Sequence, residues 1–283
     1  MKKVLITGCN GQLGRALNSL LADQPDITVI NTDVDTLNIC DTDQVLTFVK
    51  EHMPDTIINC AAHTAVDKCE TDQDNAYQIN AIGPKNLALA AKEIDAVIVQ
   101  VSTDYVFDGN TDRPYIESDT PCPQSVYGST KLAGEKAVAE ATDKYYIART
   151  AWLYGDGNNF VKTMLRLAQT HDTITVVNDQ FGSPTSALEL ARMILHIVDS
   201  KEYGIYHATC EGSTSWFIFA KTIFEMAKID INVVPVTTEE YTAAVAKRPK
   251  HSVLENKKLN AQGSYRMKEW QDALKEYMTQ LGY

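Results

Sequence analysis

Three side chains near the middle of the chain have the chemistry that reduction of a carbonyl group needs. A hydride that adds to the carbonyl carbon leaves an alkoxide oxygen, which must receive a proton. Tyr127 can donate that proton, and Lys131 stands four residues later, on the same face if this stretch is a helix. The lysine ammonium would lower the phenol's pKa from its usual value of about 10. Thr103 could donate a hydrogen bond to the carbonyl or to the tyrosine, so all three residues are predicted to be catalytic.

A glycine-rich turn near the N-terminus is typical of a dinucleotide-binding site. Gly8, Gly11 and Gly14 follow an apolar, β-branched run and open a stretch with helical periodicity. Glycines permit a tight turn and let a pyrophosphate approach the main chain, where the free N–H groups of the helix start attract it. Asp33 ends the next β-branched run, where a carboxylate can bind the adenosine ribose. This acid favours NADH over NADPH, but a single contact leaves both cofactors open.

The order of these features along the chain strengthens the catalytic prediction. A Tyr-x-x-x-Lys pair alone is a weak signal, because such pairs are common on solvated helix faces. Here the glycine-rich turn comes first, the hydroxyl of Thr103 ends a later apolar run, and the pair follows. Between the turn and Thr103, the small residues Ala61 and Ala62 would let the chain pass beside a cofactor. We expect His63 to contact the cofactor through its main chain rather than to act as a catalytic histidine.

The first half of the sequence predicts a scaffold that brings these residues together. Apolar, β-branched runs alternate with stretches of helical periodicity, which indicates a parallel sheet with helices on both faces. The predicted strands are 3–7, 28–32, 56–59, 97–102 and 145–149, and the predicted helices are 13–21, 43–51, 74–81 continuing towards 93, and 125–141. Ligands of such folds bind at the carboxyl ends of the strands. The predicted fold class is α/β, with a doubly wound Rossmann-type sheet.

The second half of the chain is less regular. Its predicted helices are 159–169, 187–197, 214–227, 239–246 and 267–281, and its predicted strands are 174–177 and 204–207. We expect residues 1–150 to form the dinucleotide-binding lobe with the catalytic helix. Residues 151–283 are expected to form a smaller, mostly helical substrate lobe, with the chain crossing between the two.

Composition argues against several other classes of protein. The 283 residues carry a net charge of −11, which disfavours a non-specific nucleic-acid binder. The six cysteines are scattered without a Cys-x-x-Cys pair, so neither a zinc cluster nor a thioredoxin-like redox site is expected. We find neither a signal-peptide pattern nor an apolar run of membrane-spanning length, and we expect a cytoplasmic protein with no membrane partner.

Six runs of residues, spread over nearly the whole chain, resemble the extended short-chain dehydrogenase/reductases. They are LITGCNGQLG at 5–14, AVDKCE at 65–70, STDYVFDG at 102–109, RTAWLYG at 149–155, DQFGSPT at 179–185 and RPKHSVL at 248–254. The third run is the most specific of them. Within the family, the resemblance implies reduction of the C4 carbonyl of dTDP-4-dehydro-L-rhamnose to dTDP-L-rhamnose, with NADH or NADPH. Tyr105 stands where sugar-nucleotide dehydratases place a second carboxylate after Asp104, which favours reduction over dehydration.

The resemblance also implies roles for individual residues. Tyr127 would be the proton donor, Lys131 its partner and a ribose ligand, and Thr103 the residue that tunes the tyrosine. Together with the glycine-rich turn, the predicted cofactor-binding residues are Gly8, Gly11, Gln12, Leu13, Gly14, Asp33, Ile39, Cys40, Ala61, Ala62, His63, Thr64, Ser102, Tyr127 and Lys131. The predicted substrate-binding residues, for a dTDP-sugar, are Thr103, Asp104, Tyr105, Trp152 and Arg248.

Alternatives to this function and one departure from the family stay open. Another sugar-nucleotide reductase, an epimerase of the same fold, or a non-catalytic regulatory subunit would share much of the pattern. Some members of the family dimerise through a divalent metal held partly by an acid just after the third glycine. This chain has Arg15 there, although Glu189 matches another ligand position. A cation beside Arg15 is disfavoured, so we predict no metal and a monomer or weak homodimer without a bridging ion.

Overall fold

The computed structural model describes residues 1–241 and 245–283, and a six-stranded sheet of parallel strands forms its centre. In their order along the sheet, the strands are β10 (Gly204–His207), β5 (Tyr145–Thr150), β4 (Val97–Thr103), β3 (Thr56–Asn59), β1 (Lys2–Thr7) and β2 (Ile27–Thr32). The strand order reverses between β1 and β3, which makes the sheet doubly wound and confirms the predicted α/β class. All of β3 and most of β4 are buried, as expected from sequences in which apolar and polar residues do not alternate regularly.

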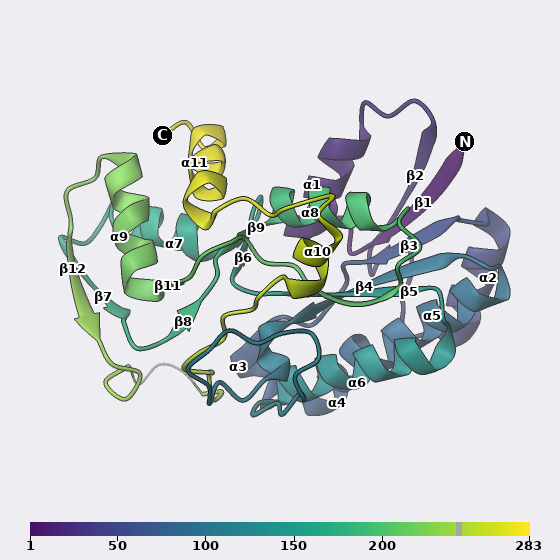
Figure 1. Cartoon of the computed structure of the whole chain (residues 1–283), viewed down its shortest axis with the longest axis horizontal. Helices are drawn as coiled ribbons and strands as arrows, with labels where there is room; N and C mark the ends of the chain where they lie inside the picture. The colour runs from purple at the N-terminus through teal and green to yellow at the C-terminus, as the bar shows by residue number, and fades with distance from the viewer. Residues whose placement is uncertain (242–244) are drawn as a thin grey trace.

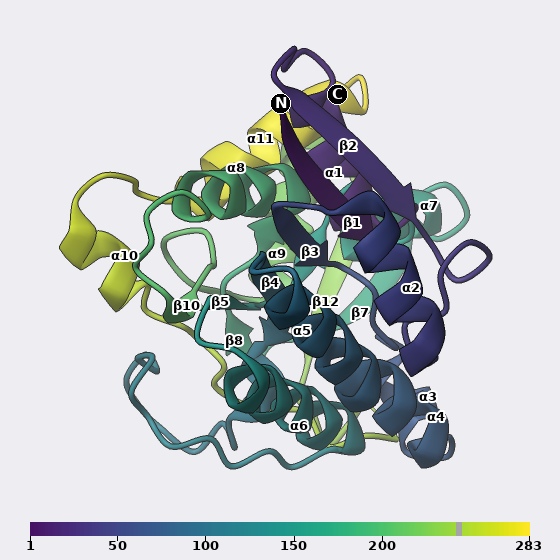
Figure 2. The ribbon, with the colours of Figure 1, turned by 90° about the vertical axis from the view of Figure 1, so that its right-hand side faces the viewer.

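Helices cover both faces of this sheet (Figure 2). On one face lie α2 (Thr42–His52), α5 (Gly83–Glu93) and α6 (Val126–Ala141), and on the other lie α1 (Gln12–Leu21) and α8 (Ala187–Ile197). Val45, Leu87 and Val138 are buried in the first layer, and Leu17 and Ile194 are buried in the second. Side-chain caps fix the start of several helices, at Asp41 for α2, Ser125 for α6 and Ser186 for α8. The two layers bury the sheet and leave its carboxyl edge free for ligands.

The helical run after β3 is interrupted by a π turn. Two short helices, α3 (Val66–Cys69) and α4 (Gln73–Tyr77), lead to π-helical residues Gln78–Ile82 and then directly to α5. Asn80 in the π turn is buried, and its side chain bonds to the main chain of His63 and to the hydroxyl of Thr130. Such turns often lie at functional sites, and this one connects the loop after β3 to the catalytic helix.

The C-terminal half builds a second core beside the sheet (Figure 1). Its elements are α7 (Phe160–Leu167), α9 (Trp216–Ala227), α11 (Trp270–Gln280) and the parallel pair β7 (Thr173–Val177) and β12 (Asn232–Val236). Two further pairs are β6 (Leu153–Tyr154) with β9 (Thr185–Ser186), and β8 (Phe181–Gly182) with β11 (Thr214–Ser215). The buried side chains of this second core include Val161, Phe219 and Leu274. A short helix, α10 (Lys257–Gln262), packs beside β10.

Some predicted elements of the second half differ from the structure. A helix was predicted over 239–246, but residues 239–241, 245 and 246 are not helical, and residues 242–244 lie outside the described part of the chain. The predicted strand 204–207 exists as β10, and it extends the central sheet beside β5 rather than lying in the C-terminal lobe. The predicted division at residue 150 stays a prediction. Across residues 1–241 and 245–283, no helix combines the length and apolar character needed to span a membrane.

Candidate active site

A cavity of about 540 Å³ opens at the carboxyl ends of β1, β3, β4 and β5, where the strand order reverses. The predicted residues that line it are Gly11, Gln12, Leu13, Ala61, Ala62, Thr64, Ser102, Thr103, Asp104, Tyr105, Tyr127, Lys131 and Trp152. Lining residues outside the predicted set are Asn59, Cys60, Val66, Val101, Thr150, Ala151, Leu153 and Trp216. The fold therefore brings the glycine-rich turn, the catalytic helix and one part of the C-terminal lobe to a single cavity.

The start of α1 offers main-chain N–H groups to this cavity. Gly11 precedes the helix and provides no side-chain cap, and Gly11, Gln12 and Leu13 all line the cavity. Gly8 has a φ of 62°, and a Cβ there would lie 2.7 Å from the main-chain nitrogen of Ala61. Only glycine therefore lets the turn pack against the end of β3. An uncapped helix start with free N–H groups suits a phosphate, so these residues fit the pyrophosphate of a dinucleotide.

The catalytic helix α6 begins close to the end of β4. Ser125 caps it by accepting a hydrogen bond from the N–H of Gly128 at 3.1 Å. A Cβ on Gly128 would lie 2.2 Å from the carbonyl oxygen of Tyr105, so glycine lets the helix approach the segment after β4. This approach places the hydroxyl of Tyr127 within hydrogen-bonding reach of Thr103, and both side chains are largely buried. The arrangement can hold a carbonyl oxygen beside a proton donor.

Lys131 is bonded to the main chain of β4 in this structure. Its ammonium donates a hydrogen bond to the carbonyl oxygen of Val101 at 2.6 Å. Burial lowers the pKa of Lys131 to about 8, while the negative charge of Glu135 acts in the opposite direction. Burial also raises the pKa of Tyr127, and the nearby hydroxyl of Thr103 offsets only part of that rise. The ammonium is bonded to Val101 in this structure, and the predicted lowering of the phenol's pKa by Lys131 stays a prediction.

Asp104 accepts a hydrogen bond from Thr103 in a buried position. The hydroxyl of Thr103 donates to Oδ1 of Asp104 at 2.9 Å, and it accepts a hydrogen bond from the N–H of Tyr105 at 3.2 Å. Oδ2 of Asp104 is buried without a hydrogen-bond partner among the described residues. Burial raises the pKa of Asp104 to about 6, against the lowering effect of the nearby hydroxyls of Ser252 and Thr103. When Asp104 is ionised, the hydroxyl of Thr103 therefore donates to Asp104 and cannot donate to a substrate carbonyl.

A buried ion pair lies behind the catalytic helix. Glu135 accepts hydrogen bonds from Nε of Arg149 at 2.9 Å and from Nη2 at 2.6 Å. Ser102 donates to the same carboxylate at 2.5 Å. All three side chains are at most 3% exposed. The network joins α6 to β4 and β5, and it occupies the hydroxyl of Ser102, which was predicted to bind the cofactor.

Two indoles form one wall of the cavity. Trp152 and Trp216 stack with their ring centroids 3.5 Å apart and their planes 8° apart. The main chain of Trp152 is left-handed, with a φ of 49°, a conformation that costs a residue with a Cβ about 1–2 kcal/mol. A Cβ on Gly182 would lie 2.5 Å from Cε2 of Trp152, so the ring packs directly on this glycine. Trp216 was missed because it lies in a predicted helix whose apolar residues indicate core packing.

Asp33 and His63 were predicted to bind the cofactor, but they do not line the cavity and form hydrogen bonds within the protein. Asp33 accepts hydrogen bonds from the main-chain N–H groups of Asn10 at 3.1 Å and Val34 at 2.8 Å. The main chain of His63 donates to Asn80 at 2.8 Å and accepts from it at 3.1 Å. Both main-chain groups of His63 are thus engaged within the protein, and its cofactor contact stays a prediction.

The remaining predicted residues outside the lining are Gly8, Gly14, Ile39, Cys40 and Arg248. Arg248, predicted to bind the substrate, donates to Asp67 at 2.9 Å. The same carboxylate group accepts hydrogen bonds from the main-chain N–H groups of Val245 at 3.0 Å and Ala246 at 2.9 Å. Asp67 therefore holds the segment that carries Arg248 against α3.

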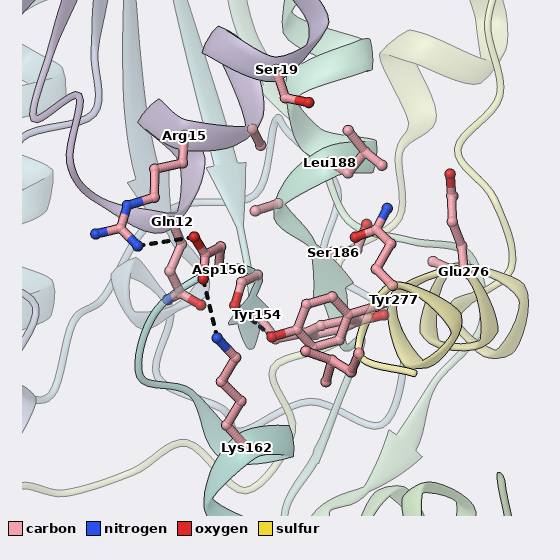
Figure 3. Close-up of a pocket in the computed structure, with 16 residues that line it drawn as sticks. Gln12, Arg15, Ser19, Tyr154, Asp156, Lys162, Ser186, Leu188, Glu276 and Tyr277 are labelled. Carbon is pink, nitrogen blue, oxygen red and sulfur yellow. Dashed lines mark hydrogen bonds and ion pairs between the residues drawn. The ribbon is translucent and has the colours of Figure 1, made fainter. Parts of the chain in front are cut away.

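A second cavity, of about 390 Å³, lies between α1, α8 and α11 and shares Gln12 with the first (Figure 3). Arg15, which follows the third glycine, donates to Asp156 at 3.0 Å, and Lys162 donates to the other oxygen of that carboxylate at 3.1 Å. One carboxylate is thus shared by two cations. In the part of the chain that the structure describes, no group of three or more His, Cys, Asp or Glu side chains is placed to hold a metal. The predicted absence of a metal stays a prediction.

The chain was compared with protein families and with solved structures. The family model described as the RmlD substrate binding domain matches residues 1–282. A dTDP-4-dehydrorhamnose reductase from Aggregatibacter actinomycetemcomitans is 41% identical over 97% of this chain and 98% of its own length.

Two solved structures are similar over nearly the full length. A dTDP-4-dehydrorhamnose reductase from Clostridium acetobutylicum is 54% identical, with a TM-score of 0.97 over 99% of this chain and 100% of its own. A dTDP-4-dehydrorhamnose reductase from Bacillus anthracis, solved in complex with NADP, is 44% identical, with a TM-score of 0.95 over 99% of both chains.

Proposed function

The chain belongs to the RmlD substrate-binding-domain family, and from this premise we propose that it is an NAD(P)H-dependent dTDP-4-dehydrorhamnose reductase, which makes dTDP-L-rhamnose. The observation that carries the proposal is the convergence of Thr103, Tyr127 and Lys131 at one cavity, beside the uncapped start of α1. The Bacillus anthracis relative was solved with NADP, which supports a nicotinamide dinucleotide as cofactor. The small-molecule substrate would enter the same cavity from the side of Trp152.

The chemistry would proceed by transfer of a hydride and a proton to the C4 carbonyl. When bound, the reduced nicotinamide supplies the hydride, which forms a C–H bond at C4 of the sugar. The carbonyl π electrons move onto oxygen, and that oxygen takes the phenolic proton of Tyr127. The products are a C4 hydroxyl and a tyrosinate, which later regains a proton from solvent. The chain's task is therefore to hold the carbonyl oxygen at Tyr127 and to stabilise the tyrosinate.

Lys131 and Thr103 would supply that stabilisation. We expect the ammonium of Lys131 to exchange the carbonyl of Val101 for a ribose hydroxyl of the cofactor, which brings its positive charge closer to the phenol. Thr103 would donate to the tyrosinate once its bond to Asp104 is released. Gly11, Gln12 and Leu13 would hold the pyrophosphate through their main chain, as the open helix start suggests.

The decisive test follows loss of reduced-cofactor absorbance with dTDP-4-dehydrorhamnose, using NADH and NADPH separately. Tyr127→Phe keeps the ring and removes only the proton donor, so we expect kcat to fall about 10²-fold or more. Tyr77→Phe, at an exposed tyrosine outside the cavity lining, is the matched control and should keep full activity. The ratio of the two cofactors' rates gives the preference that Asp33 alone does not decide.

Two results would redirect the assignment. A bound cofactor that is not consumed while the sugar nucleotide changes configuration would indicate an epimerase. Cofactor binding without any reaction on this or other sugar nucleotides would indicate a regulatory protein. Full activity of Tyr127→Phe would disprove the proposed proton donor.

A further inference from the structure

The indole of Trp152 depends on a partner from a distant part of the chain. A residue with a Cβ persists at a φ of 49° only when its surroundings hold it there, and such strain concentrates at functional sites. Trp216 covers a face of the indole, at 3.5 Å between centroids, and Gly182 fits against its edge. Two neighbours that fit the ring of a residue with a strained main chain indicate that the ring's orientation matters to the site.

Trp216 is itself held firmly by the elements around it. β11 pairs with β8, with Thr214 opposite Gly182 and Ser215 opposite Phe181, which brings the start of α9 beside the strand that carries Gly182. Ser215, immediately before Trp216, caps α9 by accepting a hydrogen bond from the N–H of Ile218 at 3.2 Å. Its hydroxyl also donates to Oδ1 of Asn178 at 2.6 Å. The main chain at the start of α9 is therefore well anchored, and its first residue, Trp216, stacks its ring on Trp152.

We propose that Trp216 is a positioning residue of the sugar-nucleotide site, which holds the indole of Trp152 in place for the incoming sugar. The inference rests on the proposed function. Both indoles line the cavity that contains Thr103 and Tyr127. An indole presents an apolar face and one N–H donor, which suits a deoxysugar with both C–H and hydroxyl groups. A wall that is already in place before the sugar arrives lowers the entropy lost on binding. Loss of Trp216 should therefore weaken binding of the sugar nucleotide and leave binding of the dinucleotide unchanged.

The test compares three variants. Trp216→Leu removes the stacked ring, and Trp216→Phe keeps an aromatic face against Trp152. Trp270→Phe is the matched control, because Trp270 is buried in the C-terminal core and does not line the cavity. KM and kcat are measured for the sugar nucleotide at saturating cofactor and for the cofactor at saturating sugar. Circular dichroism reports the pair directly, because two stacked indoles couple their transitions into a paired positive and negative band.

We expect Trp216→Leu to raise KM for the sugar nucleotide about tenfold, equal to about 1.4 kcal/mol. KM for the cofactor should stay unchanged and kcat within about threefold, since the proton donor is untouched. Trp216→Phe should restore most of the sugar affinity. The coupled band should disappear in both Trp216 variants and persist in Trp270→Phe.

Several results would overturn the proposal. One is an unchanged sugar KM in a Trp216→Leu protein that has lost the coupled band. Another is an equal rise of both KM values. If the wild type does not reduce the sugar at all, the proposed function fails, and calorimetry with dTDP-L-rhamnose still decides the role of Trp216. Weaker binding by Trp216→Leu than by the wild type would support it, and equal binding would reject it.

Discussion

Asp104 and Thr103 illustrate, at the scale of single residues, how protonation sets the direction of a hydrogen bond. An ionised carboxylate can only accept, so Thr103 must donate to Asp104, as the 2.9 Å contact indicates. A protonated Asp104 can donate instead, which frees the hydroxyl proton of Thr103 for another acceptor. Burial raises the pKa of Asp104 to about 6, so both states are accessible near neutral pH.

The same residue should make stability depend on pH. The native pKa of about 6 exceeds the unfolded value of about 3.9, so the native state binds more protons between these values. The free energy of unfolding should therefore fall as pH rises from about 4 through about 6, by up to about 3 kcal/mol. Asp104→Asn keeps an acceptor for Thr103 but cannot ionise, so it should remove this slope and be more stable at pH 7.

Urea unfolding of Asp104→Asn and wild type across this pH range checks the prediction. Asp112→Asn, at an exposed carboxylate in the loop after β4, is the control and should follow the wild type. Parallel pH curves for the wild type and Asp104→Asn would show that the carboxyl group titrates normally.

At the scale of elements, the pair of Glu135 and Arg149 connects the catalytic helix to β5. Glu135→Gln would leave the buried guanidinium of Arg149 uncompensated, which costs about 3–5 kcal/mol. It would also remove the charge that keeps the pKa of Lys131 from falling further. We expect a lower urea midpoint and an altered pH profile of kcat. Glu140→Gln, on an exposed position of the same helix, should change the free energy of unfolding by at most about 0.5 kcal/mol. Equal stability of both variants would contradict a structural role for the pair.

The elements also show what the sequence could predict. Strands β3 and β4 were placed to within one residue, because burial on both faces leaves a β-branched run without regular alternation of apolar and polar residues. The π turn could not be predicted, since the bonds of Asn80 to His63 and Thr130 come from distant segments. Trp216 and the bond of Lys131 to Val101 were missed for the same reason. Motifs at strand ends predict the part of the cavity that the central sheet forms. The part that Trp216 forms depends on tertiary packing and could not be predicted in this way.

At the scale of the whole molecule, we expect no metal-bridged assembly. Glu189, which matches a ligand position of the family, accepts hydrogen bonds from Tyr265 at 2.8 Å and from Arg192 at 3.3 Å. Arg192 also donates to Glu276 at 2.7 Å, and Arg15 brings a further positive charge near α8. Sedimentation velocity should give the same mass with a chelator as with added magnesium. A smaller mass in the chelator would contradict the prediction.

The position of β10 has a consequence for the order in which the molecule is made. The edge of β5 is covered by a strand that ends at His207, so the sheet stays incomplete while residues 151–207 are synthesised. At about 5–20 residues per second, this takes roughly 3–11 s on the ribosome. During that interval the nascent chain carries an unpaired strand edge, the feature that most readily pairs with another chain. Because synthesis runs from the N-terminus, the β5 edge of the dinucleotide-binding half is exposed before β10 has been made. Folding without aggregation then depends on how soon β10, from the other half of the chain, pairs with β5.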